Sequence, residues 1–101
     1  MPYIKQSQRA AVNRFIDALV EEMNEQIDCE AIPSAGLVNY VITRIVAGTL
    51  RPPFTGWSYS SLSTALAVFR DAEAEMRRRL LDPYEDKAIA KNGDIPEYED
   101  G

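Results

Sequence analysis

Four polar side chains that could bind a ligand or a partner fall on one arc of a predicted helix. They are Asn39, Tyr40, Thr43 and Arg44, in the stretch LVNYVITRIVAGTL. Arginine supplies charge, tyrosine supplies a stacking surface, and the amide and hydroxyl groups supply hydrogen bonds, as recognition surfaces require. Two interpretations fit this arc. It is either an exposed polar face or polar network within the monomer, or a binding surface or contact between subunits.

Residues for common catalytic and metal chemistry are absent or poorly spaced. The chain has no histidine, which removes the usual nucleophile triads and most zinc sites. The acidic segment NGDIPEYED lacks the alternating ligands of a calcium-binding loop. Glu73 and Asp86 could be paired on paper as an acid and a base, but any acidic helical protein permits such a pair. We therefore expect no enzyme, no catalytic residue, no metal site and no cofactor.

Negative charge is concentrated at the C-terminal end of this 101-residue chain. Four of its 16 acidic side chains fall in residues 94–101 without a base, which leaves 12 acidic and 11 basic side chains in residues 1–93. We expect residues 1–93 to form a single domain and residues 94–101 to be a flexible acidic tail. Broad nucleic-acid binding is not expected, because it requires clustered Lys and Arg.

Cysteine use and hydropathy indicate a cytoplasmic protein. Cys29 is the sole cysteine, so no intramolecular disulfide can form. The sequence offers neither a signal-peptide apolar segment nor the roughly 20 apolar residues needed to cross a bilayer.

The periodicity of apolar residues predicts an all-α fold, a compact bundle of three main helices with a short capped helix after them. The expected helices are residues 8–27, 35–50, 60–81 and 83–91. Serine caps are expected at Ser7, Ser34 and either Ser60 or Ser61. The expected core residues are Leu19, Ile42, Ile45, Leu66 and Phe69. In the loop RPPFTGWSYSS, Phe54 and Trp57 either fold back over the bundle, which we favour, or form an exposed aromatic edge.

The segment DPYEDKAIAKNG carries its own start and stop signals. Asp82, Pro83 and Glu85 suit an N-cap, a first helical position and a capping box, and Gly93 suits a left-handed stop. The segment is therefore either an independent capped helix or a kinked continuation of the third helix.

The stretches YI, NYVITRI and PYEDKAIAKNGDI resemble a family of small helical proteins of unknown function from bacteriophages and prophage-bearing bacteria. The resemblance implies a phage or prophage source, hence the host bacterial cytoplasm, and it brings no known active site. PPFTGW departs from the family pattern. The motif positions include Asn39, Arg44 and Asp94, whose presence backbone geometry does not explain. We predict that Asn39, Tyr40, Thr43, Arg44 and Asp94 bind a ligand or partner.

Three functions follow as hypotheses. The first is a non-enzymatic, self-associating phage accessory protein, acting in counter-defence, that occupies a host protein or sequesters a small anionic ligand of the nucleotide type. The second is a structural or assembly component of a phage particle. The third is an enzyme that acts on nucleotides or peptides.

Overall fold

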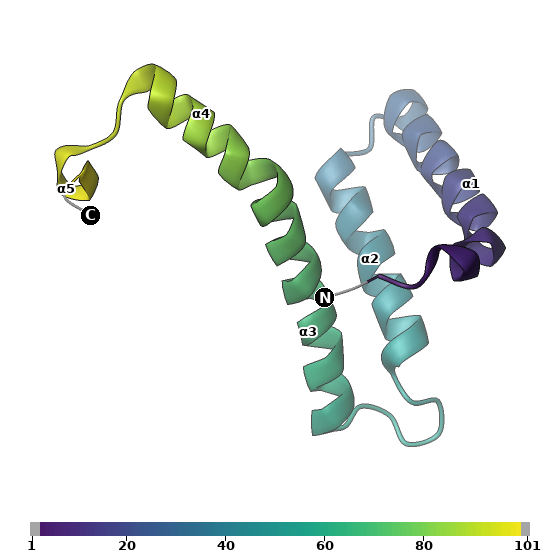
Figure 1. Cartoon of the computed structure of the whole chain (residues 1–101). Helices are drawn as coiled ribbons and strands as arrows, with labels where there is room; N and C mark the ends of the chain where they lie inside the picture. The colour runs from purple at the N-terminus through teal and green to yellow at the C-terminus, as the bar shows by residue number, and fades with distance from the viewer. Residues whose placement is uncertain (1–2, 100–101) are drawn as a thin grey trace. The chain divides into compact units, whose positions relative to one another are not determined.

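The computed structural model describes residues 3–99 and is all-α (Figure 1). The structure is 82% helical, and residues 3–99 contain no strand. This confirms the predicted fold class. The chain divides into two compact units, residues 1–57 and 58–101. The single domain over residues 1–93 and the flexible tail therefore stay predictions.

The first unit is a pair of helices joined by a short turn. Helix α1 spans Gln6–Glu30 and helix α2 spans Ser34–Leu50, and the two run in opposite directions (Figure 1). Ala31 ends α1 in the left-handed region, with φ of 53°, although it is not glycine. Pro33 then directs the chain into α2.

The N-terminal caps of α1 and α2 differ from those predicted. Lys5, not Ser7, precedes α1, and its backbone N–H donates to Oε1 of Gln8 at 3.0 Å, while the Gln8 N–H donates to the Lys5 carbonyl at 2.9 Å. Ser7 therefore falls inside the first turn. Pro33 takes the cap position of α2, because its carbonyl accepts from the Leu37 N–H at 3.0 Å, so Ser34 becomes the first helical residue.

The second unit is one long helical path interrupted by a wider turn. Helix α3 spans Tyr59–Met76, a π-helical turn η1 spans Arg77–Leu81, and α4 spans Asp82–Asn92. Ser58 caps α3. Its Oγ accepts from the Ser61 N–H at 3.1 Å, and the Ser61 Oγ accepts from the Ser58 N–H at 2.9 Å. The predicted caps at Ser60 and Ser61 were therefore wrong: Ser61 is the third helical residue and closes a reciprocal capping box.

Proline accounts for the wider turn. Pro83 lacks an N–H, and its ring crowds the carbonyl four residues before it. The chain lengthens the turn ahead of the proline, so the Asp82 N–H donates to the Arg77 carbonyl five residues back. Asp82 has helical angles, φ −60° and ψ −47°, and does not act as a cap. Of the two alternatives for this segment, continuation of the third helix is the one observed.

Gly93 ends α4 with a positive φ, as predicted, but its ψ is not that of a left-handed helical residue. Its φ is 89°, and its N–H donates to the Ile89 carbonyl at 2.7 Å. With ψ of 157°, the residue lies outside the left-handed helical region, in a region that glycine alone occupies readily. One further helical turn, α5, spans Pro96–Glu99.

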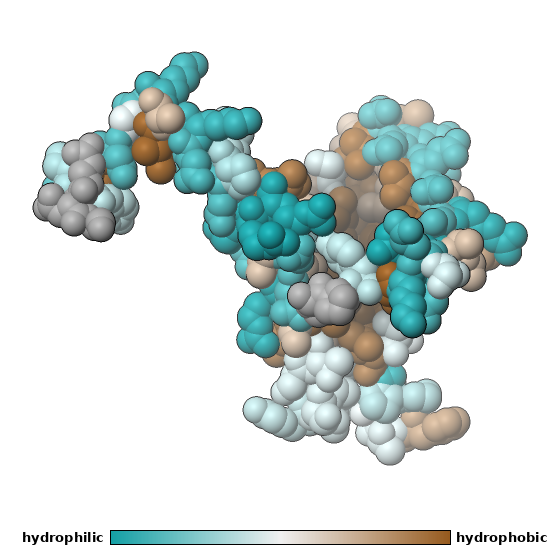
Figure 2. Space-filling model, viewed as in Figure 1, coloured by the Kyte–Doolittle hydropathy of each residue, from teal (hydrophilic) through white to brown (hydrophobic). Residues whose placement is uncertain are grey.

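Few side chains are buried within residues 3–99. Val46 and Ala65 are the buried apolar residues, at 9% and 6% exposure, and no polar or charged residue is buried. The predicted core was wrong: exposed fractions run from 38% to 63% for Leu19, Ile42, Ile45, Leu66 and Phe69. The reason is that a helix pair or a single helical path cannot enclose stripes this wide, so apolar side chains reach the surface (Figure 2). Compact bundle packing is not shown.

The loop after α2 also leaves its aromatic tip in solvent. The Gly56 N–H donates to the Pro52 carbonyl at 3.1 Å, and Gly56 has φ of 73°, a value that favours glycine. This turn leaves Phe54 98% exposed, so Phe54 does not fold back as we had favoured, whereas Trp57 is 38% exposed.

Within residues 3–99, no helix has both the length and the apolar character that crossing a membrane would need.

Candidate functional site

The predicted site residues of α2 form two neighbouring pairs, each joined across one helical turn. The Thr43 hydroxyl donates to the Asn39 carbonyl at 2.8 Å and lies 3.3 Å from Asn39 Oδ1. Arg44 Nη1 donates to the Tyr40 hydroxyl at 3.0 Å, and the guanidinium carbon lies 5.8 Å from the centroid of the tyrosine ring. Because i and i+4 residues share a helical face, the two pairs lie side by side.

All four of these side chains lie on the surface. Each is exposed, and Tyr40 retains 59% of its accessible area. A polar network buried inside the monomer, which was one interpretation of this face, is not what residues 3–99 contain. The face is open to a partner as it stands.

Arg44 has no carboxylate within 4.0 Å among residues 3–99, which also holds for Arg9, Arg14, Arg51 and Arg70 but not for Arg77, Arg78 and Arg79. Helix α2 contains no Asp or Glu, and Arg44 is its one charged residue. Among residues 3–99, the ion pairs within 4.0 Å involve Arg77, Arg78 and Arg79, and Arg44 has none. Tyrosine positions the guanidinium without neutralising it.

The free hydrogen-bonding groups suit an anion. A guanidinium has five N–H donors in a rigid plane, and Arg44 uses one of them on Tyr40. Asn39 adds an amide group next to it, whereas the Thr43 hydroxyl is already committed to its own helix. Planar donors of this kind match a carboxylate or phosphate, and the tyrosine ring offers a surface for a base or another planar group.

Asp94, the remaining predicted site residue, belongs to the second unit. Its Oδ1 accepts from the Ile95 N–H at 2.8 Å, just after α4 ends. This bond gives Asp94 a local role in turning the backbone after Gly93. The four α2 residues are brought together by their helix, and the structure does not join Asp94 to them.

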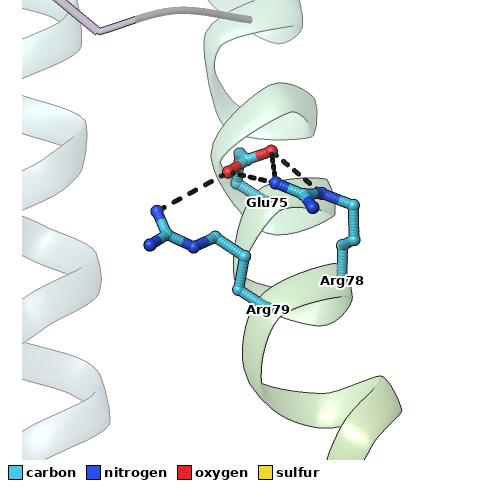
Figure 3. A network of polar contacts seen from close by, with 3 residues as sticks. All are labelled: Glu75, Arg78 and Arg79. Atoms are coloured by element: carbon cyan, nitrogen blue, oxygen red, sulfur yellow. Dashed lines mark hydrogen bonds and ion pairs between the residues drawn. The ribbon is translucent and has the colours of Figure 1, made fainter.

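A second set of charged residues occupies the end of α3 and the π turn. Arg78 donates to Glu75 at 2.9 and 3.2 Å, and Arg79 lies 3.9 Å from the same carboxylate (Figure 3). The hydrogen bond from Arg78, with the positive charges of Arg78 and Arg79, lowers the pKa of the Glu75 carboxyl below its ordinary value. Arg77 donates to Glu73 at 2.6 Å, which raises the pKa of the Arg77 guanidinium.

Sequence analysis missed an apolar groove beside these charges. It has a volume of about 450 Å³ and is lined by two rows of side chains. Within each row, successive residues are four positions apart in the sequence. The rows are Glu73, Arg77 and Leu81, and Met76, Leu80 and Tyr84. Met76, Leu80 and Tyr84 are 65% to 71% exposed. A signal did exist: Tyr84 follows Met76 and Leu80 at the four-residue spacing that places side chains on one face of a helix.

The fold is that of a small all-helical protein in which the α2 face and the groove are exposed to solvent. Residues 1–95 match the family described as a domain of unknown function, DUF6899, and the chain belongs to that family. No curated protein and no solved structure was found to match the chain. The family match covers the α2 face, the groove and Asp94, and it assigns a role to none of them.

Proposed function

We propose that this chain is a non-enzymatic accessory protein that associates with itself and binds through the polar face of α2. The binding residues are Asn39, Tyr40, Thr43 and Arg44. The bound species is a small anionic ligand of the nucleotide type or a host protein that presents an equivalent anionic group. Asp94 contributes at the second unit.

One observation carries this proposal. Arg44 is exposed, held against Tyr40 at 3.0 Å and free of any carboxylate within 4.0 Å among residues 3–99. An arginine without a counter-ion, in a chain of net charge −5, is a local positive site where most of the surface repels anions. A phosphate would accept its remaining N–H groups, and a base would stack on the tyrosine.

The biological setting is part of the same proposal. The resemblance of NYVITRI and PYEDKAIAKNGDI to phage and prophage proteins supports a phage or prophage source. We place the protein in the host bacterial cytoplasm, acting in counter-defence by stoichiometric binding. We also propose that the helices pack as a compact bundle. Such a bundle would form if the apolar faces of α1, α2 and α3 were covered, either within one chain or between copies.

The test is ligand-dependent stabilisation with matched arginine variants. Thermal melting is measured with adenine and guanine mononucleotides, with adenosine as the probe that lacks phosphate. We expect nucleotides to raise the melting temperature, Arg44→Ala and Tyr40→Ala to remove that rise, and Arg44→Lys to retain part of it, because lysine keeps the charge but loses the planar fork.

Arg14→Ala is the control. Arg14 is also exposed and lies 4.6 Å from an aromatic ring, that of Phe15, but in α1, beside an acidic polar face. If Arg14→Ala and Arg44→Ala weaken binding equally, the α2 face is not the site. Native mass spectrometry of the protein from producing cells then distinguishes the two partner classes, since it reports a retained small molecule or a bound protein by mass.

A further inference from the structure

The end of α2 carries a second arginine on the same face as Arg44. Arg51 follows Arg44 by seven residues, which is close to two helical turns, and its φ of −79° keeps it near helical geometry although it caps α2. Arg51 is exposed and has no carboxylate within 4.0 Å among residues 3–99. The polar face of α2 therefore extends beyond the four residues of the proposed function and ends in a second cation.

No acidic residue lies in the part of the first unit that contains both arginines. Residues 31–57, which include α2 and the loop after it, contain no Asp or Glu, although the whole chain has 16. Residues 1–30 contain six, and all six lie in α1. Within the first unit, negative charge is therefore restricted to α1, and α2 presents two positive groups to an approaching anion.

The spacing of the two arginines selects the kind of anion. Seven residues of helix place their Cα atoms about 10 Å apart. The guanidinium of Arg44 is turned toward Tyr40, nearer the start of α2, whereas Nη2 of Arg51 reaches the following loop, 3.4 Å from where a Cβ on Gly56 would stand. Neighbouring phosphates of a nucleoside diphosphate share an oxygen atom and are too close together to meet both groups. Phosphates of a nucleotide chain are separated by a sugar, which suits the wider spacing.

An exposed aromatic ring accompanies each arginine. Tyr40 holds Arg44 and is 59% exposed, and Phe54, three residues after Arg51, is 98% exposed in its loop. Unpaired bases stack on such rings with little regard to sequence. Two arginines are too few for a duplex, whose binding depends on neutralising many phosphates. The order aromatic, arginine, arginine, aromatic therefore suits a single strand.

Gly48 lies between the two arginines, one turn after Arg44. A glycine inside a helix is destabilising relative to alanine, so a packing reason is expected for it. A Cβ built at Gly48 meets no atom within 4 Å, and packing therefore does not explain the residue. The bare backbone at this position leaves room for a ligand to pass close to the helix.

We propose that the polar face of α2 binds a short single-stranded oligonucleotide, with one phosphate at Arg44 and another, at least one nucleotide away, at Arg51. Bases stack on Tyr40 and Phe54, and the strand passes over Gly48. This inference rests on the proposed function, because Tyr40 and Arg44 belong to both. It narrows the nucleotide-type ligand to one that carries separated phosphates.

Calorimetry with deoxyadenylates of one, two and three nucleotides, each carrying a 5′ phosphate, tests the proposal. We expect affinity to rise with length. Its decrease with salt should be steeper for the trinucleotide than for the mononucleotide, because a further contact between arginine and phosphate releases further counter-ions. Adenosine diphosphate, whose two phosphates are adjacent, should bind without any contribution from Arg51.

Variants of the second cation and of the loop separate their contributions. Arg51→Ala should weaken trinucleotide binding on the order of tenfold and reduce its salt dependence to that of the mononucleotide. Arg51→Lys should keep the salt dependence, because it keeps the charge. Phe54→Ala should weaken the trinucleotide roughly fivefold or more through the loss of one stacked base.

Two matched controls remove the same kinds of side chain elsewhere. Arg14→Ala removes an exposed arginine from α1, and Tyr98→Ala removes a 73% exposed aromatic ring that lies between Glu97 and Glu99 in the sequence. Both side chains have acidic neighbours that repel a phosphate, so neither change should affect trinucleotide binding.

Gly48→Leu blocks the path of the strand without removing a charge. Because leucine favours a helix more than glycine does, this variant should melt at a higher temperature than the unmodified chain and yet bind the trinucleotide more weakly. Weaker binding in a more stable protein cannot come from a failure to fold. Trinucleotide binding that is unchanged in Gly48→Leu would contradict a strand lying against this part of α2.

The outcomes distinguish this inference from the proposed function. Equal trinucleotide binding by Arg51→Ala and the unmodified chain would overturn the inference. If the mononucleotide then still binds through Arg44, the proposed function stands and only the extension to Arg51 fails. If Arg44→Ala changes the binding of no probe, both fail. A loss in Arg51→Ala that is the same for every probe would also overturn the inference, because it would not come from a second phosphate.

Discussion

Helix α2 and the path from α3 to α4 use arginine in opposite ways. Arg44 rests on a phenol and meets no carboxylate, whereas Arg77, Arg78 and Arg79 each lie within 4.0 Å of a glutamate one turn away. Local pairing leaves the second set little net charge to offer a small anion. An arginine without a carboxylate beside it can meet an anion, whereas arginines paired with glutamates one turn away are largely neutralised.

The two regions also differ in how far their apolar side chains are exposed. Val46 on α2 is buried, whereas Met76, Leu80 and Tyr84 in the second unit are open. On α2, packing covers Val46 alone, since Ile42 and Ile45 on the apolar face stay 41% and 50% exposed. On the path from α3 to α4, charged and apolar rows border the same groove.

The largest expected effect comes from placing the same new charge on the two faces of α2. Val46→Asp would put a carboxylate at a position 9% exposed and should cost about 2 to 4 kcal/mol, because burial removes its hydration without a partner. Thr43→Asp adds the charge at an exposed position and should leave stability nearly unchanged. It should instead weaken nucleotide-dependent stabilisation, because a negative charge beside Arg44 repels the phosphate. Urea unfolding and thermal shift measure the two quantities.

A smaller loss is expected at the end of α4. Gly93→Val places a β-branched residue at φ 89° and ψ 157°, which should cost about 1 to 3 kcal/mol. Removal of residues 96–101 should hardly change the melting temperature, since it leaves the α4 stop in place. Hydrogen exchange should show the Gly93→Val loss as faster exchange in α4, with α2 unaffected. Equal losses from both changes would show that the tail is held in place.

Truncation of exposed apolar residues tests how far the apolar faces are packed in solution. Leu66 is 63% exposed, so Leu66→Ala should cost less than about 1 kcal/mol in the unfolding free energy of the monomer. A compact bundle would instead lose about 2 to 5 kcal/mol at this position, as for a buried leucine. Urea unfolding at a concentration where the chain is monomeric decides between the two.

Sequence patterns predicted the helices far better than they predicted burial. Apolar spacing located α2 to within one residue at its start and correctly at Leu50, because the period of a helix is a property of the segment itself. The same spacing marks which face is apolar but not what covers it. Leu19 and Phe69 were therefore assigned to the core, but the structure leaves them 38% and 39% exposed.

The candidate site shows the same division. The α2 face could be found because Asn39, Tyr40, Thr43 and Arg44 lie within two helical turns. The groove was missed because Asp82 and Pro83 were expected to start a separate helix, which divided Tyr84 from Met76 and Leu80 although the three follow one another at four-residue spacing. The serine cap of α3 was missed for a related reason: several serines lie close together, and the reciprocal bond between Ser58 and Ser61 selects Ser58.

The smallest effect is a pH dependence confined to the paired charges of the second unit. The hydrogen bond from Arg78 lowers the pKa of Glu75 in the folded chain relative to its ordinary value of 4.5. A carboxyl whose folded pKa is lowered stabilises the fold above its unfolded pKa and loses that contribution as pH falls through the lower, folded value. Helicity measured by circular dichroism should therefore decline slightly as pH falls below about 4.5.

Glu75→Gln should remove that part of the decline, because glutamine does not titrate. Glu21→Gln is the control: Glu21 is exposed and has no ion pair within 4.0 Å among residues 3–99, so its variant should show the same loss of helicity at low pH as the unmodified chain. Added salt should also reduce the decline, since the pairs are surface pairs and are screened. A decline that is the same in Glu75→Gln would mean that the pairing in Figure 3 does not persist in solution. The contrast between the neutralised arginines of η1 and the free Arg44 would then be lost.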